Sequence, residues 1–77
     1  MNYETTILKI ISTVSSTEIS DIHPQSYFIK DLNFTILKFS EMLDLIEEEF
    51  NIKFTAFEEP HIHTVDDFIK QVRMKIQ

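Results

Sequence analysis

The sequence predicts an all-α domain, an up-down bundle of three main helices plus a short fourth, with a long loop after the first helix. Two observations support this prediction. Apolar residues recur at i, i+3, i+4 and i+7 in three separate segments, which is the spacing that places them on one face of an α-helix. In addition, the chain has 77 residues and no candidate internal boundary, so residues 1–77 form one domain around a single modest core.

The three main helices are expected from Tyr3 to about Ser15, from Ile36 to Phe50, and from Val65 to Ile76. Each segment carries one apolar stripe that faces the core, while charged residues such as Lys38 and Glu41 occupy the opposite face of the second helix. In chain order the stripes are Ile7, Ile10, Ile11 and Val14, then Phe39, Met42, Leu43, Ile46 and Phe50, and finally Val65, Phe68, Ile69, Val72 and Ile76.

The segments between the helices also carry structural signals. Thr35 and Thr64 precede the second and last main helices, where a hydroxyl can accept a first-turn amide; for Thr64 this is the amide of Asp67. The connection from Ser16 to Phe34 is long, and we expect it to pack over the bundle because it holds too many apolar residues for a free linker. These residues are Ile19, Ile22, Tyr27, Phe28, Ile29 and Leu32. A short helix is expected around Phe57 to His61.

Composition excludes several classes of function. The net charge of −6 argues against nucleic-acid binding, which needs a basic patch, and suits a basic protein partner. The chain contains no glycine, so glycine-rich phosphate loops are excluded. It contains no cysteine, which excludes disulfides and thiolate zinc sites. No apolar run approaches the roughly 20 residues of a membrane span, and the N-terminus lacks the features of a secretory signal. We therefore expect a cytoplasmic monomer.

The centre of the chain carries a specific motif. The stretch Asp31-Leu32-Asn33-Phe34-Thr35-Ile36-Leu37 is followed by an acidic segment that ends in Glu47-Glu48-Glu49-Phe50. This block resembles the prosthetic-group segment of acyl carrier proteins, whose pattern is Asp-Leu-Gly-x-Asp-Ser-Leu and whose second helix ends in Glu-Glu-Glu-Phe. The resemblance extends over essentially the whole chain and implies the acyl-carrier fold.

The departures from the family pattern gather at its functional centre. Ile36 stands where the family has the serine that carries 4'-phosphopantetheine, so no cofactor is predicted. Asn33 replaces the glycine, Thr35 replaces an aspartate, and Lys38 replaces an acidic residue. Thr35 and Ser40 are the nearest hydroxyls to position 36. Thr35 is an improbable substitute because its hydroxyl is expected to cap the helix.

The resemblance also implies a partner surface on the second helix. In the family this acidic helix docks on the basic surface of an enzyme or synthase that recognises carrier proteins. The matching positions are Leu37, Ser40, Glu41, Asp44, Glu47 and Glu48. The alternative interpretation is that these acidic residues form an ordinary solvated face.

Other residues have simpler interpretations. Seven phenylalanines predict a filled interior, and plain core packing is preferred over a lipid pocket. The core is expected to contain Phe28, Met42, Leu43, Ile46, Phe50, Ile62 and Phe68. His61 and His63 lack a third ligand at a recognised spacing, so no metal site is predicted. No catalytic set is recognised, and the chain is predicted not to be an enzyme.

Three hypotheses for function remain. The preferred one is a non-enzymatic interaction module that has the carrier fold, has lost the phosphopantetheine serine, and presents the acidic second helix to carrier-recognising enzymes. The second is a genuine acyl carrier protein of fatty-acid or polyketide-type biosynthesis, mutated or modified at another residue. The third is an unrelated acidic helical adaptor whose resemblance is coincidental.

Overall fold

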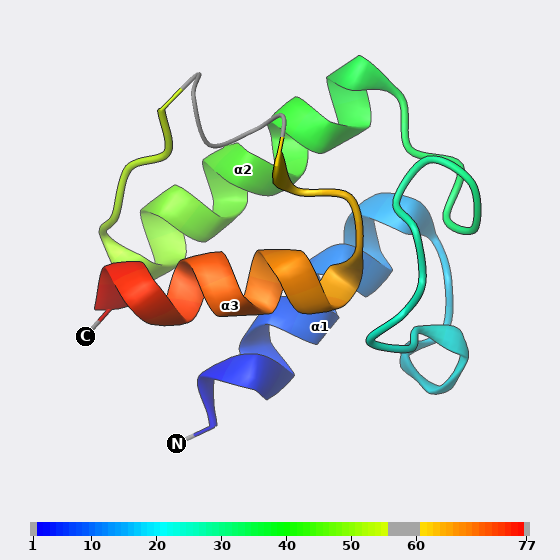
Figure 1. Cartoon of the computed structure of the whole chain (residues 1–77), viewed down its shortest axis with the longest axis horizontal. Helices are drawn as coiled ribbons and strands as arrows, with labels where there is room; N and C mark the ends of the chain where they lie inside the picture. The colour runs from blue at the N-terminus through cyan, green and yellow to red at the C-terminus, as the bar shows by residue number, and fades with distance from the viewer. Residues whose placement is uncertain (1, 56–60, 77) are drawn as a thin grey trace.

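A computed structural model describes residues 2–55 and 61–76 of the chain. It contains α1 (Tyr3–Ser15), a short 3-10 turn η1 (Ile19–Asp21), α2 (Ile36–Phe50) and α3 (Val65–Ile76) (Figure 1). The bounds of the three main helices agree with the predicted ones. The short helix expected around Phe57 to His61 falls largely on residues 56–60, which lie outside the described residues.

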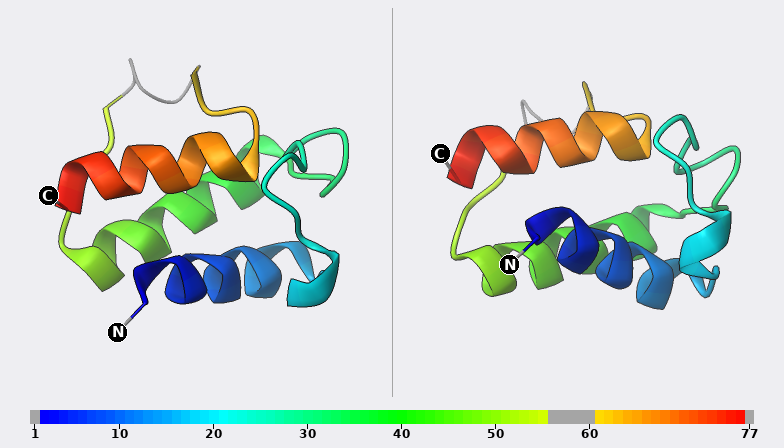
Figure 2. Two further views of the ribbon diagram at one scale, coloured as in Figure 1. Left: turned by 60° about the horizontal axis from the view of Figure 1, so that its bottom comes forward. Right: turned by 90° about the horizontal axis from the view of Figure 1, so that it is seen from below.

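The helices do not alternate strictly in direction. α1 and α2 run in opposite directions, as an up-down bundle requires, but α3 runs in roughly the same direction as α2 (Figures 1 and 2). Both ends of the chain therefore lie at the same end of the molecule, and the long loop between α1 and α2 lies at the other end. The start of α2 is placed beside that loop.

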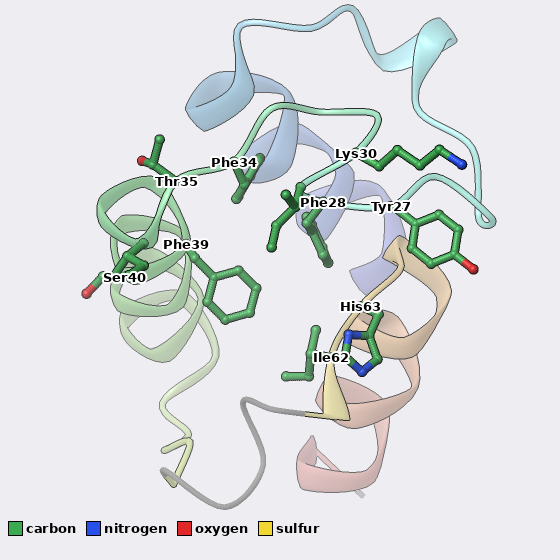
Figure 3. A pocket seen from close by; sticks show the side chains of 11 residues that line it. Tyr27, Phe28, Lys30, Phe34, Thr35, Phe39, Ser40, Ile62 and His63 are labelled. Atoms are coloured by element: carbon green, nitrogen blue, oxygen red, sulfur yellow. The ribbon is translucent and has the colours of Figure 1, made fainter.

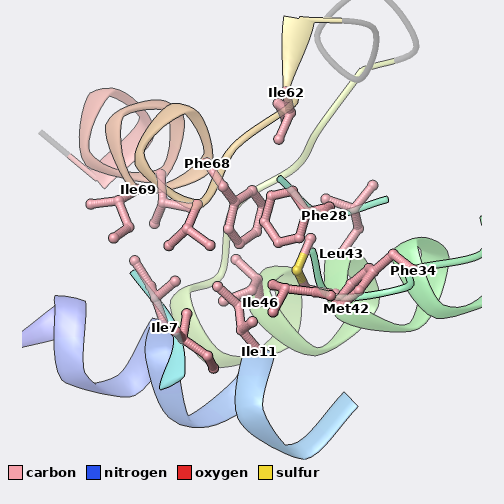
Figure 4. Packing of buried hydrophobic residues seen from close by; sticks show 14 residues of the cluster. Ile7, Ile11, Phe28, Phe34, Met42, Leu43, Ile46, Ile62, Phe68 and Ile69 are labelled. Carbon is pink, nitrogen blue, oxygen red and sulfur yellow. The ribbon is translucent and has the colours of Figure 1, made fainter. Parts of the chain in front are cut away.

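The core lies between the three helices and the long loop (Figure 4). Six of the seven predicted core residues are buried there, and Phe50 packs against them partly buried. Ile76 was predicted to face the core with the rest of its stripe, and this was wrong, because its side chain in the last turn of α3 is 41% exposed. The buried apolar side chains are Ile7, Ile11, Ile22, Phe28, Leu32, Phe34, Met42, Leu43, Ile46, Ile62, Val65, Phe68, Ile69 and Val72.

Both predicted threonine caps are present. Thr35 Oγ1 accepts the amide of Lys38 at 3.2 Å, and Thr64 Oγ1 accepts the amide of Asp67 at 3.1 Å. The carboxylate of Asp67 accepts the amide of Thr64 in return, at 3.1 Å, which completes a reciprocal capping arrangement. These bonds satisfy amides that have no partner within the helix, so they fix where α2 and α3 begin.

The long loop is tied to the start of α3 by backbone hydrogen bonds. The amide of Phe28 donates to the carbonyl of His63 at 3.0 Å, and the amide of Val65 donates to the carbonyl of Ser26 at 3.0 Å. The Phe28 side chain is buried among core rings, which anchors the loop from inside. The loop is therefore packed over the bundle as predicted.

The apolar residues of the loop do not all face the core. Ile22, Phe28 and Leu32 are buried, but three others are exposed: Ile19 at 41%, Tyr27 at 47% and Ile29 at 78%. Tyr27 points away from the core because the backbone pairing of residues 26–28 with residues 63–65 makes this short piece of the loop extended, and successive side chains of an extended chain alternate in direction. Ile29 lies in the turn over residues 28–32 that follows, where the amides of Asp31 and Leu32 both donate to the Tyr27 carbonyl.

Candidate functional site

The turn that leads into α2 holds the motif residues in structural roles. Asp31 Oδ2 accepts the amide of Tyr27 at 2.7 Å, and the amide of Asp31 donates to the Tyr27 carbonyl at 2.9 Å. Asn33 has φ 57°, in the left-handed region that favours glycine, with asparagine as the next best choice. Position 33 is where the carrier pattern has glycine, and asparagine is a residue type that tolerates this left-handed conformation.

The first turn of α2 exposes aliphatic side chains. Ile36 is 91% exposed and Leu37 is 69% exposed. Ile29, from the neighbouring loop, is 78% exposed, and it lines the same cavity as Ile36. The first turn contains no acidic residue. Position 36 is thus fully accessible to a partner, but an isoleucine side chain has no atom that can act as a nucleophile.

The predicted partner-binding residues divide into two groups. Leu37, Ser40, Glu41, Asp44 and Glu48 are exposed along α2, and we call the last three the acidic face. Glu47 differs, because it is only partly exposed and its Oε2 accepts the amide of Phe54 at 2.8 Å. Glu47 therefore holds the chain that leaves α2 and offers less exposed surface than the other five residues.

An open apolar cavity of about 760 Å³ lies beside the start of α2 (Figure 3). Most of the residues that line it are exposed, so the cavity opens at the surface and is not a void inside the core. Packed aromatic rings form one wall of the cavity: Phe28 meets Phe34 at 5.0 Å and Phe39 at 5.7 Å between ring centroids, with tilted and edge-on geometry. The lining residues are Tyr27, Phe28, Ile29, Lys30, Phe34, Thr35, Ile36, Phe39, Ser40, Ile62 and His63.

The cavity joins three segments that are distant in sequence, which is why local patterns did not reveal it. The loop at 27–30, the start of α2 and residues 62–63 each contribute a wall. No carboxylate occurs among the described residues that line it, although the chain has 13 acidic residues. The hydroxyls nearest to position 36, those of Thr35 and Ser40, also line this cavity.

The electrostatics at the start of α3 are set by capping. Partial burial acts to raise the pKa of Asp67, but backbone hydrogen bonds from Thr64 and His63 and the bond with the Thr64 side chain outweigh it and lower that pKa. The amide of His63 donates to Asp67 Oδ2 at 3.1 Å. The described parts of the chain contain no group of three or more His, Asp or Glu residues that could hold a metal ion.

Comparison with known proteins connects this geometry to a family. No protein-family model matches the chain. The sequence is 34% identical over 67 residues to the acyl carrier protein of Shigella flexneri, covering 87% of this chain and 86% of that protein. It is 28% identical over 75 residues to the acyl carrier protein of Chlamydia caviae, covering 97% of each.

The fold also has a solved counterpart. The solution structure of the apo doublet acyl carrier protein from prodigiosin biosynthesis superposes with a TM-score of 0.78 at 15% sequence identity. The match covers 94% of this chain and 35% of that longer chain, and at this identity it establishes the fold alone. Within the described residues, no helix is long and apolar enough to cross a membrane.

Proposed function

The chain belongs to the acyl carrier protein family, and we propose that it acts there as an interaction module without a prosthetic arm, presenting α2 to enzymes that recognise carrier proteins. Acyl carrier proteins are non-enzymatic carriers, which confirms that the chain is not an enzyme. A coincidental resemblance is set aside, because relatives align over most of the chain and α2 begins at Ile36 after a packed loop.

The observation that carries the proposal is the combination of an acidic face with an isoleucine at position 36. Glu41, Asp44 and Glu48 are exposed along one side of α2, and electrostatic complementarity between such a face and a basic partner speeds and orients association. At the start of the same helix Ile36 is 91% exposed. A partner can therefore reach position 36, but the isoleucine side chain has no hydroxyl to which the phosphopantetheine arm could be attached.

The residues present do not fit covalent attachment of phosphopantetheine at position 36. Attachment needs a hydroxyl oxygen that forms a bond to phosphorus, and an isoleucine side chain offers only carbon and hydrogen. The left-handed Asn33 supports the alignment that puts Ile36 at the serine position, because it falls where the carrier pattern has its glycine. These residues therefore support no reaction step that uses phosphopantetheine at position 36.

A binding experiment tests the proposal with three purified enzymes: a broad-specificity phosphopantetheinyl transferase, a ketoacyl synthase and an acyltransferase. We expect at least one to bind the wild-type chain, and we expect Glu41→Lys combined with Glu48→Lys to weaken that binding at least about tenfold, because two attractions become repulsions. The affinity of the wild type should also fall as salt is added.

The matched control combines Glu18→Lys with Asp21→Lys at η1. It produces the same change in net charge at exposed residues outside α2. The control variant should bind like the wild type. Equal affinity of the α2 variant and the wild type, or no binding by any of the three enzymes, would sink the proposal.

The cavity favours a second candidate, a working carrier of fatty-acid or polyketide-type intermediates. An apolar space of about 760 Å³ beside position 36 falls in the size range of small-molecule pockets, and it suits an acyl chain. Attachment would then use another residue, and Thr35 and Ser40 are the hydroxyls beside the cavity. Thr35 Oγ1 already accepts the amide of Lys38, whereas Ser40 is exposed. Intact-mass analysis after incubation with coenzyme A and the transferase separates the two candidates.

A further inference from the structure

The start of α2 carries an apolar patch that the core does not use. It consists of Ile29, Ile36 and Leu37, which are 78%, 91% and 69% exposed. Ile29 and Ile36 both border the apolar cavity, so the patch and the cavity wall form one continuous apolar region. Exposed aliphatic side chains grouped in this way mark an interaction site more often than scattered single ones do.

We infer that Ile36 is the anchor residue of the docking surface, and that its side chain enters an apolar socket on the partner protein. This inference rests on the proposed function and deepens it by naming the residue at the centre of the contact. Binding energy in protein interfaces concentrates in a few side chains that become fully desolvated in a pocket. Ile36 has almost all of its surface available for such burial.

The charged residues around the patch indicate which charges the partner should carry around its apolar socket. Glu41 and Asp44 lie about 8 and 12 Å farther along the α2 axis than Ile36, at 1.5 Å per residue. On the loop side the charged residues are Lys30, whose Nζ lies 6.0 Å from the centre of the Tyr27 ring, and Asp31, whose Oδ2 already accepts the amide of Tyr27. The partner surface should therefore have basic side chains on only one side of its apolar socket, the side that faces the later turns of α2.

Two other binding partners for the apolar patch would fit the surrounding charges less well. A second copy of this chain would bring another net charge of −6 against the first, and like charges across an interface disfavour association. An anionic lipid surface would be repelled in the same way. A basic protein surface with a socket matches both the patch and the acidic face.

The test uses the same three enzymes as the charge-reversal experiment. Full burial of an isoleucine corresponds to about a ten- to hundredfold gain in affinity. We therefore expect Ile36→Ala to lose about that factor against the enzyme that binds the wild type best. Ile36→Val should stay within about fivefold of the wild type, because it removes a single methylene group. The salt dependence of binding should be the same for Ile36→Ala and the wild type, because no charge changes.

The possible outcomes separate this inference from the proposed function. Unchanged affinity of Ile36→Ala, together with loss of binding in the Glu41 and Glu48 variant, would overturn the anchor and leave the docking proposal standing. If the charge variant also binds normally, or no enzyme binds, both fail. A wild-type dimer in sedimentation that Ile36→Ala dissociates would place the socket on a second copy and overturn the inferred partner. Matching thermal melts of the variants and the wild type exclude a folding effect, since position 36 is 91% exposed.

Discussion

Phe28 is the side chain that holds the long loop on the helices, and Phe28→Ala is the perturbation that tests this role. Its ring is 1% exposed and lies 5.0 Å from the ring of Phe34, 5.7 Å from Phe39 and 5.9 Å from Phe68, between centroids. One side chain thus joins the loop to α2 and α3. Its removal should loosen the loop that positions the start of α2.

The expected cost follows from this packing. Truncation of a buried phenylalanine to alanine costs about 3–5 kcal/mol, and three ring contacts in tilted or edge-on geometry place Phe28 toward the upper part of that range. The void would also merge with the cavity that Phe28 already lines. A chain of this size has a total stability of about 4–12 kcal/mol. Phe28→Ala should therefore remove a third or more of the free energy of unfolding.

Urea denaturation followed by circular dichroism measures this loss. Phe28→Leu is a milder companion that should cost about 1 kcal/mol, so a stability change remains measurable if the alanine variant does not fold. Ile29→Ala is the matched control, because Ile29 is adjacent in sequence but 78% exposed, and it should change stability by less than about 0.5 kcal/mol. A loss of under about 1 kcal/mol for Phe28→Ala would refute the anchoring role.

Three further predictions concern local hydrogen bonds and backbone conformation. The pKa of Asp67 is lower in the folded chain than its ordinary value of 3.8. The ionised carboxylate therefore stabilises the fold fully at pH values above 3.8, and this stabilisation is lost as the pH falls through the lower pKa of the folded state. Asp67→Asn should flatten the fall in melting temperature between about pH 5 and 3. Ser16→Gly should raise the free energy of unfolding by about 0.5–1 kcal/mol, because Ser16 has φ 58°. Glu47→Ala should cost about 1 kcal/mol in urea titration by freeing the amide of Phe54.

The helices were predictable because their signals are local. Each stripe has helical spacing, and Thr35 and Thr64 place hydroxyls where they accept first-turn amides. The errors occur where tertiary context decides. Ile76 belongs to the stripe by spacing, but the last turn of α3 leaves it 41% exposed. Ile29 is apolar yet exposed, because it lies in the turn over residues 28–32 that follows the backbone pairing of the loop.

The candidate site was predictable only in part, for the same reason. The exposure of Glu41, Asp44 and Glu48 follows from their place opposite the apolar stripe. The bond from the amide of Phe54 to Glu47 depends on the path of the chain after α2, which no local pattern specifies. The cavity was missed because its walls come from three segments, and only the folded chain brings Ile62 beside the start of α2.

The measurement that tests the central claim most directly is the intact mass of the protein. It is recorded on protein purified from its own cells and again after incubation with coenzyme A and a broad-specificity phosphopantetheinyl transferase, with Ile36→Ser as a parallel sample. We predict an unmodified mass for the natural chain in both conditions, because Ile36 offers no hydroxyl. An added phosphopantetheine on the natural chain in either condition would contradict the account and identify a working carrier.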